Sequence, residues 1–534
     1  MFLIPQKLLF LPFLMSSFAL AKSSLKRVAQ DTSLAAQGHW TKLRELEKQG
    51  VLFSAEVTHL GTGEDLGSYE GQQRLIPASV TKLVIGAAAL EKWGADHAIT
   101  TKLYYSGTRK GPTIHGDLVL DGSGDPGLTN EKIWFLASDV ARLGITKVTG
   151  IFKINTSRFA PVPLDENRAA GKNYSTHAYD SPLSAAAVNY SVMAVVAGPG
   201  SFVGAPAHIS LEPFKLPHLV VSGEVKTTSL GKSALQVSRL KTAQTERITV
   251  SGQVPADSFP IRSYKSISDA DQYAAEVYRA FLQEAGVKFG GKYVKETTPP
   301  DFGQLKPLSQ VEGFPLDYHL KGLMQMSNNF IADMLTISLP AVDENTRGLE
   351  LKKGTKILES YLSKVSENVN RGDYSPIGNS VFTDDKAFSK ANENDTPQNY
   401  ANKLVLHSGS GLTPQNRVSA SEANALLRYM YHQPQTFPAF LAALPAPGTD
   451  STLRKRFNTP STQQLGTRLR AKTGTLTEPR DAVGLAGYVR LSDGQWASFA
   501  VIANGSATQP NPGTDRLRQA IDQDLASLFQ NRVR

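Results

Sequence analysis

The chain has 534 residues, of which 40% are hydrophobic and 20% are charged, and it contains no cysteine. The length exceeds one ordinary hydrophobic core, so two or three domains are expected, and the absence of cysteine excludes disulfides, thiolate metal sites and a catalytic or lipid-modified cysteine. The formal net charge of +9 is modest for this length; it fits attraction to an anionic polymer or membrane surface, or simply a solvated surface. No RNP string, zinc finger or basic heptad occurs, so no nucleic-acid partner is predicted.

The N-terminal segment has the features of a secretory signal peptide at residues 1–21. Lys7 supplies the positive charge, a short apolar run follows, and Ala19-Leu20-Ala21 forms an A-x-A cleavage site. The run is too short to cross a bilayer and Pro12 interrupts it, which argues against the alternative of a membrane anchor. We therefore expect a soluble, periplasmic or otherwise exported protein after cleavage near Ala21, with no integral membrane anchor.

A helix and a strand precede the first motif. Residues 40–48 resemble a short amphipathic helix, and residues 51–57 have the composition of a strand. A turn-rich stretch then leads to Ser79-Val80-Thr81-Lys82, and the apolar run that follows stops at Trp93-Gly94. Ser79 is expected near a helix N-terminus, with Lys82 one turn later on the same face. An isolated S-x-x-K string is usually an N-capping serine and a solvated lysine, so it carries little weight alone.

A long segment separates this string from the next motif, because Ser327 follows Ser79 by 248 positions. A single cleft needs far fewer residues. We expect one inserted domain, or two nested ones, at residues 106–261, within a discontinuous catalytic domain formed by residues 22–105 and 262–534. The inserted part is predicted to be mainly β, with one helix near residues 130–143. Its β-like runs are residues 117–120, 147–154, 219–222 and 247–250.

No cofactor and no metal are predicted. The string from Gly122 to Gly127 satisfies G-x-G-x-x-G, but Pro126 disfavours a helix opening inside it and the acidic residue expected about 20 positions later is missing. The 10 histidines form no cluster with ligand spacing.

The second motif, Ser327-Asn328-Asn329, lies between two segments of helical character, residues 320–325 and 330–339. Ser327 and Asn329 are therefore expected at a loop that joins two helices. Further on, residues 366–402 are rich in Asn, Asp, Lys and Ser, which is typical of a polar surface insertion.

The third motif, Lys472-Thr473-Gly474, ends a predicted strand at residues 469–472. Two more strands are expected at residues 484–490 and 496–503, forming an antiparallel set. Thr514–Phe529 is expected to close the chain as a helix, because Leu517, Ile521 and Leu525 recur every four residues.

The three strings in this order match the S-x-x-K, S-x-N and K-T-G set of penicillin-recognising serine acyltransferases. Together they supply a nucleophile, a base, a proton relay and a carboxylate anchor. The chain resembles the D-alanyl-D-alanine carboxypeptidase/endopeptidases of the penicillin-binding-protein-4 type, which are class C low-molecular-mass penicillin-binding proteins of serine peptidase family S13. Similar segments extend over most of the chain, at residues 116–126, 181–189, 408–419 and 486–490.

The resemblance implies an α+β fold with a serine-β-lactamase/transpeptidase-like core, in which helices flank an antiparallel sheet. It also implies cleavage of D-Ala-D-Ala termini and D,D cross-links in peptidoglycan stem peptides, and inhibition by β-lactam antibiotics. The implied catalytic residues are Ser79, Lys82, Ser327 and Lys472. The implied substrate-binding residues are Asn329, Thr473, Gly474 and Thr475.

Each residue type fits a step of that chemistry. A serine hydroxyl needs an adjacent base, and Lys82 can serve if burial and the nearby cation Lys472 keep it neutral. Backbone N–H groups of Ser79 and Thr475 would hold the oxyanion, at about 3 kcal/mol per donor. Ser327 would relay a proton to the leaving amine and Asn329 would bind the peptide amide. Lys472 and Thr473 would bind the terminal carboxylate, while Gly474 lets substrate lie against the strand edge.

The chain departs from the family at three positions. Ser408 and Pro414 replace the aspartate and arginine of the usual D-G-S-G-L-S-R, and Asn155 stands where the family often has aspartate. In relatives, that arginine and that inserted-domain aspartate help to hold the free zwitterionic end of diaminopimelate, so we expect weakened selectivity for it. Two alternatives stay open: a β-lactamase or esterase on the same core, and a catalytically weak cell-wall-binding or penicillin-sensing protein.

Overall fold

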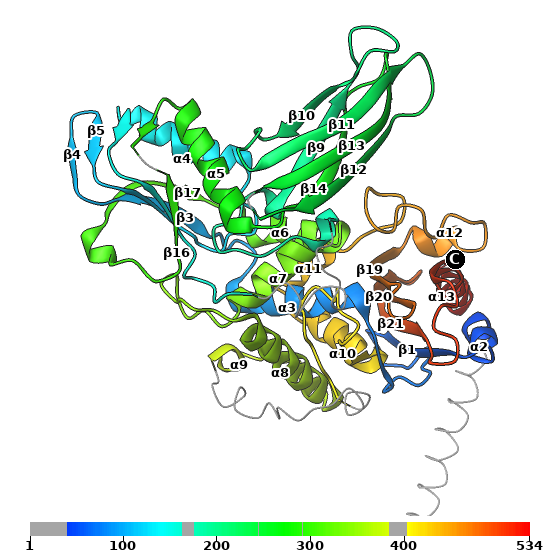
Figure 1. The fold of residues 1–534 in the computed structure, drawn as a ribbon. Helices are drawn as coiled ribbons and strands as arrows, with labels where there is room; N and C mark the ends of the chain where they lie inside the picture. Colours follow the sequence, from blue (N-terminus) through cyan, green and yellow to red (C-terminus); the bar gives the residue numbers. More distant parts are fainter. Residues whose placement is uncertain (1–39, 163–175, 244, 291, 384–402, 534) are drawn as a thin grey trace, which may run out of the picture.

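A computed structural model describes residues 40–162, 176–243, 245–290, 292–383 and 403–533. At its centre lies a four-stranded antiparallel sheet in the order β1-β21-β20-β19. Its strands are β1 (Val51–His59), β19 (Leu469–Leu476), β20 (Ala482–Arg490) and β21 (Trp496–Gly505). The sheet thus joins the beginning of the described chain to its end, with blue β1 beside the orange and red strands in Figure 1.

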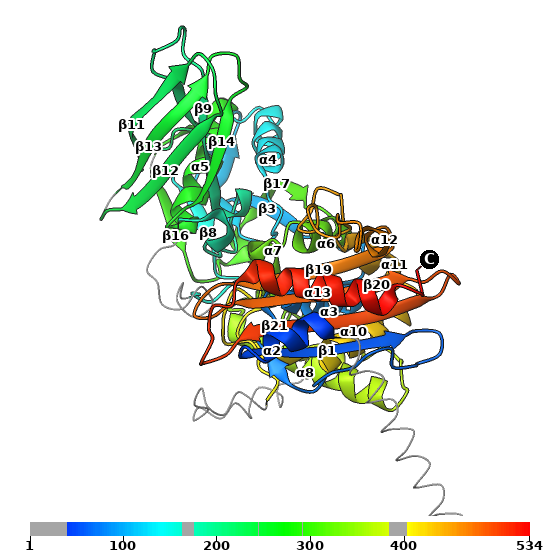
Figure 2. The same cartoon turned by 90° about the vertical axis from the view of Figure 1, so that its right-hand side faces the viewer.

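This sheet is covered on both faces. Every residue of β20 except Arg490 is buried, as expected for a continuous apolar run between two layers. Val483 and Leu485 share a core with the helices α2 (Thr41–Glu47) and α13 (Thr514–Phe529). Ala486 and Tyr488 face the opposite layer, which contains α3 and α10. Figure 2 shows α2 and α13 lying across the near face of the sheet.

The layer on the other face consists mainly of helices, with the two-stranded sheet of β2 (Arg74–Leu75) and β18 (Val418–Ser419) beside them. Its helices are α3 (Lys82–Trp93), α6 (Leu316–Gln325), α7 (Asn329–Ser338), α8 (Leu351–Asn370), α10 (Ala420–Tyr431) and α11 (Phe437–Ala443). Of the two short helices, α9 (Ser380–Thr383) packs in this layer, whereas α12 (Gln463–Gly466) packs with α13 on the opposite face of the sheet. The prediction of an α+β fold with helices flanking an antiparallel sheet is confirmed.

The segment between α3 and α6 forms separate sheets that lie above this core in Figure 1. The sheet nearest the core has the order β16-β8-β6-β3-β17, a small one has the order β15-β7-β5-β4, and two more have the orders β10-β9-β14 and β11-β13-β12. The strands are β3 (Thr100–Tyr105), β4 (Thr108–Lys110), β5 (Thr113–His115), β6 (Leu118–Asp121), β7 (Lys147–Val148), β8 (Phe152–Asn155), β9 (Val192–Gly198), β10 (His208–Glu212), β11 (Leu219–Thr228), β12 (Ala234–Lys241), β13 (Glu246–Pro255), β14 (Ile261–Ser266), β15 (Lys288–Phe289), β16 (Tyr293–Glu296) and β17 (Lys306–Glu312). Helices α4 (Asn130–Arg142) and α5 (Ala270–Glu284) share their apolar core.

The expected return to the catalytic domain at residue 262 does not fit these pairings. β14 pairs with β9, β16 pairs with β8, and β17 pairs with β3. Helix α5 also packs in the inserted core. We therefore propose that the inserted part runs from about β3 to the end of β17. The sequence did not show this boundary, because a strand belongs to the sheet of its partners and a local residue pattern does not reveal those partners.

Two further expectations concern segments that lie wholly or partly outside the described residues. The polar insertion was expected from residue 366, but helix α8 continues to Asn370, and residues 384–402 lie outside the described residues. The signal peptide at residues 1–21 lies outside them as well. Within the described ranges, no helix is both long and apolar enough to cross a membrane.

Candidate active site

Ser79 lies in a single turn of 3-10 helix, η1 (Ala78–Thr81), directly before α3. Ala78 adopts a positive φ of 48°, an uncommon conformation for a residue with a side chain, and the Thr81 hydroxyl donates to the Ala78 carbonyl at 2.9 Å. The turn brings Lys82 Nζ to 2.9 Å from Ser79 Oγ. The sequence correctly placed the two side chains together at a helix start, and it missed the 3-10 turn.

Lys82 is completely buried, although it is a lysine at the start of a helix. Its ammonium donates to Ser79 Oγ, to Asn329 Oδ1 at 2.6 Å and to the Ser410 carbonyl. A buried ammonium is tolerated only when its donors are satisfied, and these three acceptors come from three separate parts of the chain. The Ser79 hydroxyl also donates to the Ser410 carbonyl, at 3.4 Å.

The loop between α6 and α7 presents the second motif. Ser327 has a positive φ of 56°, and Asn328 caps α7 by accepting from the Ile331 N–H at 3.0 Å. Asn329 is the first residue of α7 and points inward, with Oδ1 on Lys82 and Nδ2 donating to the Tyr179 carbonyl at 2.9 Å. The predicted loop between two helices is present, and the middle residue of the motif turns out to be the helix cap.

Strand β19 carries the third motif along the edge of the central sheet. Lys472 is completely buried and donates to Ser327 Oγ at 3.0 Å and to the Thr473 carbonyl at 2.8 Å. Burial, followed by repulsion from the Lys82 ammonium, holds the pKa of Lys472 well below its ordinary value. The two lysines therefore resist carrying two full charges together.

Gly474 is required by the close approach of β19 to the Ser79 turn. A Cβ atom at this position would lie 2.5 Å from the Pro77 carbonyl oxygen and 3.1 Å from the Ser79 nitrogen. The strand edge therefore runs beside the backbone of Ser79. The Thr473 hydroxyl donates to Thr452 Oγ1 at 2.8 Å, and Thr475 Oγ1 accepts from Arg518 at 3.2 Å.

The structure thus brings the five side chains together as two hydrogen-bonded groups, one of Ser79, Lys82 and Asn329 and one of Ser327 and Lys472. The two groups are close enough for Lys82 to lower the pKa of Lys472. It adds three residues that the sequence did not single out: Ser410, Tyr179 and Thr452. Ser410 lies in the S-G-S-G segment, so its sequence neighbourhood carried a signal. Tyr179 and Thr452 contribute a carbonyl and a hydroxyl, and no sequence pattern marks them.

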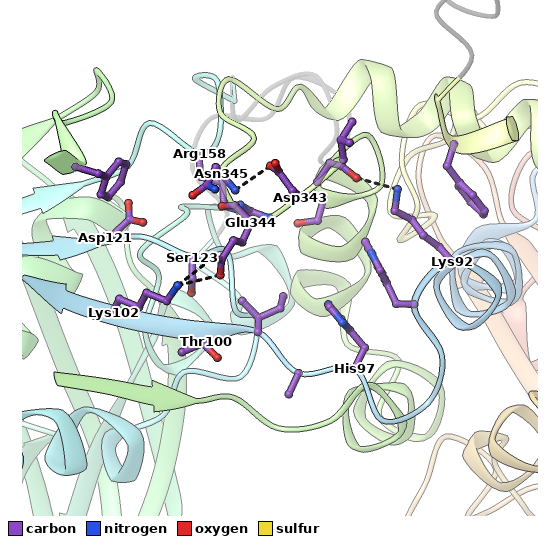
Figure 3. Close-up of a pocket in the computed structure, with 18 of the residues that line it drawn as sticks. Lys92, His97, Thr100, Lys102, Asp121, Ser123, Arg158, Asp343, Glu344 and Asn345 are labelled. Carbon is purple, nitrogen blue, oxygen red and sulfur yellow. Dashed lines mark hydrogen bonds and ion pairs between the residues drawn. The ribbon is translucent and has the colours of Figure 1, made fainter. Parts of the chain in front are cut away.

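Two cavities flank this part of the protein. One of about 510 Å³ adjoins Ser327 and Asn329 and extends to the inserted sheet at Tyr264. The other, of about 420 Å³, lies between the end of α3 and strand β3 (Figure 3). In it Lys102 pairs with Glu344 at 3.0 Å, and burial lowers the pKa of Lys92 to about 8.

None of the eight predicted site residues lines the cavity of Figure 3. Lys92 is ten residues beyond Lys82 on α3, a separation of about 15 Å along a helix. The cavity of Figure 3 therefore lies apart from the predicted site residues, of which Ser327 and Asn329 line the other cavity.

The residues that depart from the family are held by local bonds. Asn155 is completely buried, with Oδ1 accepting from Ser157 N and Oγ at 2.9 and 2.7 Å, and Nδ2 donating to the Thr298 carbonyl at 3.0 Å. Arg417, three residues after Pro414, donates to the Pro414 and Asn416 carbonyls.

Comparisons with known proteins point to one family. The sequence profile of the D-Ala-D-Ala carboxypeptidase 3 (S13) family matches residues 40–370 and 400–528. The D-alanyl-D-alanine carboxypeptidase of Actinomadura sp. (strain R39) is 28% identical over 475 residues, covering 86% of this chain and 78% of the relative. The D-alanyl-D-alanine carboxypeptidase DacB of Haemophilus influenzae is 25% identical over 466 residues, covering 84% and 85%. The crystal structure of penicillin binding protein 4 (dacB) from Haemophilus influenzae has a TM-score of 0.66 at 22% identity, covering 90% of this chain and 96% of that one.

Proposed function

This chain belongs to the D-Ala-D-Ala carboxypeptidase 3 (S13) family of serine-type peptidases, and we propose that Ser79 is the nucleophile with which it cleaves D-Ala-D-Ala termini and D,D cross-links of peptidoglycan. One observation carries the assignment of roles: Lys82 Nζ lies 2.9 Å from Ser79 Oγ, while Lys472 Nζ lies 3.0 Å from Ser327 Oγ. A nucleophile with an adjacent amine, next to a second hydroxyl with its own amine, suits acyl transfer.

The reaction proceeds in two halves. The neutral Lys82 amine takes the Ser79 proton as the oxygen attacks the carbonyl of the penultimate D-alanine. Backbone N–H groups of Ser79 and Thr475 hold the oxyanion that forms. Ser327 passes its proton to the leaving nitrogen and receives in exchange the proton that Lys82 took from Ser79. The C–N bond breaks, and the terminal D-alanine or the cross-linked strand departs. Water then attacks the acyl-enzyme and gives a proton to the neutral Lys82 amine, which passes it to Ser79 Oγ as the ester bond breaks.

The substrate itself helps to set the charges of the two lysines. A terminal carboxylate beside Lys472 stabilises the Lys472 cation, which burial otherwise opposes. Because repulsion between the two amines is mutual, a charged Lys472 disfavours protonation of Lys82. The binding of substrate therefore prepares the base for its task.

Strand β19 and Asn329 hold the peptide. As the edge strand of its sheet, β19 offers unpaired backbone groups to an extended chain. The Asn329 side-chain nitrogen carries two hydrogens. One is donated to the Tyr179 carbonyl, and the other is available to the carbonyl oxygen of the substrate amide. The cavity of about 510 Å³ beside Ser327 and Asn329 gives the rest of the stem peptide room to lie between the catalytic core and the inserted sheets.

Release of D-alanine tests this function directly. A stem pentapeptide ending in D-Ala-D-Ala and a cross-linked stem dimer are incubated separately with the protein lacking residues 1–21, and products are followed by mass spectrometry. We expect one D-alanine from the pentapeptide and two monomers from the dimer. Turnover of a β-lactam with no release of D-alanine would favour the β-lactamase alternative instead.

We further propose that the protein is exported, with cleavage near Ala21.

We expect the KM for a peptide with a free C-terminal carboxylate to rise with pH. The rise should begin at a lower pH than it would if the carboxylate were bound by an exposed lysine with an ordinary pKa. The pKa of Lys472 is well below its ordinary value because of burial and Lys82. The cation that binds the carboxylate is present below that pKa and lost above it. Steady-state kinetics against pH measure the effect, with the C-terminal amide of the same peptide as the uncharged control. An identical rise for the amide would show that the charge of Lys472 does not bind substrate.

Selectivity for the free zwitterionic end of diaminopimelate is expected to be weak. Removing that end from a model peptide should change kcat/KM by less than about tenfold, or about 1.4 kcal/mol. The reason is that Asn155 is buried with its amide bonded internally and Pro414 offers no charge. Paired kinetics with a diaminopimelate peptide and its analogue lacking the zwitterion give the ratio. A loss of two or more orders of magnitude would mean that other residues read this end.

A further inference from the structure

A buried carboxylate lies one layer behind the catalytic lysine. Asp333 is on α7, four residues after Asn329 and so on the same helix face. It is completely buried. Its Oδ1 accepts from the Ser408 hydroxyl at 3.0 Å and from the Ser410 N–H at 3.1 Å. None of the catalytic roles described above uses this group.

The segment that Asp333 holds ends in the carbonyl that contacts Lys82. The N–H of Ser410 points to Asp333, and the carbonyl of the same residue accepts from Lys82 Nζ and from Ser79 Oγ. The Ser408 hydroxyl reinforces this geometry, because it lies 2.6 Å from Ser410 Oγ and also accepts from the Ser410 N–H at 3.0 Å. The bonds that hold the Ser410 N–H therefore also fix the position of the Ser410 carbonyl.

The same segment is packed closely against α7. A Cβ atom at Gly409 would lie 1.9 Å from Thr336 Oγ1, so only glycine fits there. Asn416 adds a bond from the far side, donating to the Ser408 carbonyl at 2.9 Å and to Thr81 Oγ1 at 3.2 Å. The segment bridges α7 and the Ser79 turn and has little room to shift.

We propose that Asp333 is a positioning residue for the acylation step: through Ser408 and Ser410 it holds the Ser410 carbonyl against the Lys82 amine, and so aims that amine at Ser79. Helix α7 thus orients Lys82 twice, directly through Asn329 and indirectly through Asp333. The inference rests on the proposed function. The inference also accounts for the serine at position 408, where the family usually has an aspartate. The carboxylate that this loop lacks is provided by Asp333 of helix α7, which accepts from the Ser408 hydroxyl.

The test is the kinetics of acylation by benzylpenicillin, resolved into the affinity of the initial complex and the rate constant of acylation. For Asp333→Ala we expect the acylation rate constant to fall about 10- to 100-fold, the range for a displaced catalytic group. The initial affinity should stay within about threefold. The burst amplitude counts the folded sites, so a loss of folded protein lowers the amplitude and leaves the rate constant of the remaining sites unchanged.

Two further variants keep the inference falsifiable. Asp333→Asn retains an oxygen acceptor in the same place and should restore the rate constant to within about threefold of wild type. Ser408→Ala removes one hydroxyl with little risk to folding and should lower the rate constant about 3- to 10-fold. Folded Asp333→Ala and Ser408→Ala proteins that acylate at the wild-type rate would overturn the inference, as would Asp333→Asn being as slow as Asp333→Ala. A wild type that is not acylated, beside an inert Ser79→Ala, would refute the proposed function rather than this inference.

Discussion

The Ser79→Ala variant is expected to take up no benzylpenicillin, whereas the wild type gains the mass of one antibiotic molecule. Release of D-alanine should fall by at least about 10⁴-fold, as for removal of the nucleophile in other serine acyl-enzymes. The physical reason is that the hydroxyl bonded to Lys82 Nζ is that of Ser79, at 2.9 Å, whereas the Ser327 hydroxyl is bonded to Lys472. Intact mass spectrometry of both proteins after exposure, together with a D-alanine assay, measures the result.

The fold should survive this change. Ser79 is only partly buried, and its removal leaves Lys82 bonded to Asn329 Oδ1 and to the Ser410 carbonyl. Thermal unfolding of the two proteins should therefore agree within a few degrees, which makes the variant a fair control. An adduct on the variant as well would place the nucleophile elsewhere. If the wild type forms no adduct, hydrolysed antibiotic would indicate a β-lactamase, and intact antibiotic would indicate a binding protein.

Elements with strong local signals were predictable from the sequence. Helix α13 has the expected bounds, because its apolar stripe repeats every four residues and Gly513 with a positive φ precedes it. Strands β20 and β21 were found within a few residues because they are apolar runs separated by turn residues, and β19 because it carries the K-T-G string. The three motifs also identified the side chains that the structure gathers around Lys82 and Lys472.

Features that depend on distant partners were not predictable. Strands β14, β16 and β17 belong to the inserted sheets only because of their partners β9, β8 and β3. The positive φ values of Ala78 and Ser327 arise where the Ser79 turn meets β19 and where Ser327 meets Lys472. The Ser410 carbonyl and Asp333 were not predicted either. A backbone carbonyl leaves no mark in a residue pattern, and Asp333 is connected to Lys82 only through the distant segment that contains Ser410.

Replacement of Lys82 by methionine is expected to lower the rate constant of acylation about 10³-fold, within the range that general-base catalysis contributes. Methionine has a similar length and no charge. Burying an ammonium costs several kcal/mol, while leaving its three acceptors without this donor costs about 1–3 kcal/mol each. These opposing effects nearly cancel, so the melting temperature should change by only a few degrees. Stopped-flow acylation and thermal unfolding of Lys82→Met, with wild type alongside, measure the two quantities.

The same variant distinguishes between the two lysines as the base. Removing the Lys82 ammonium removes one of the two causes that lower the pKa of Lys472, so that pKa should rise and the carboxylate substrate should bind up to a higher pH than in wild type. Burial remains, so the pKa stays below its ordinary value. If Lys82→Met still acylated at nearly the wild-type rate, the proton would have to pass to Lys472 through Ser327, the other hydroxyl–amine pair at 3.0 Å. Loss of acylation together with tighter binding of the carboxylate at high pH would instead assign proton abstraction to Lys82 and anchoring to Lys472.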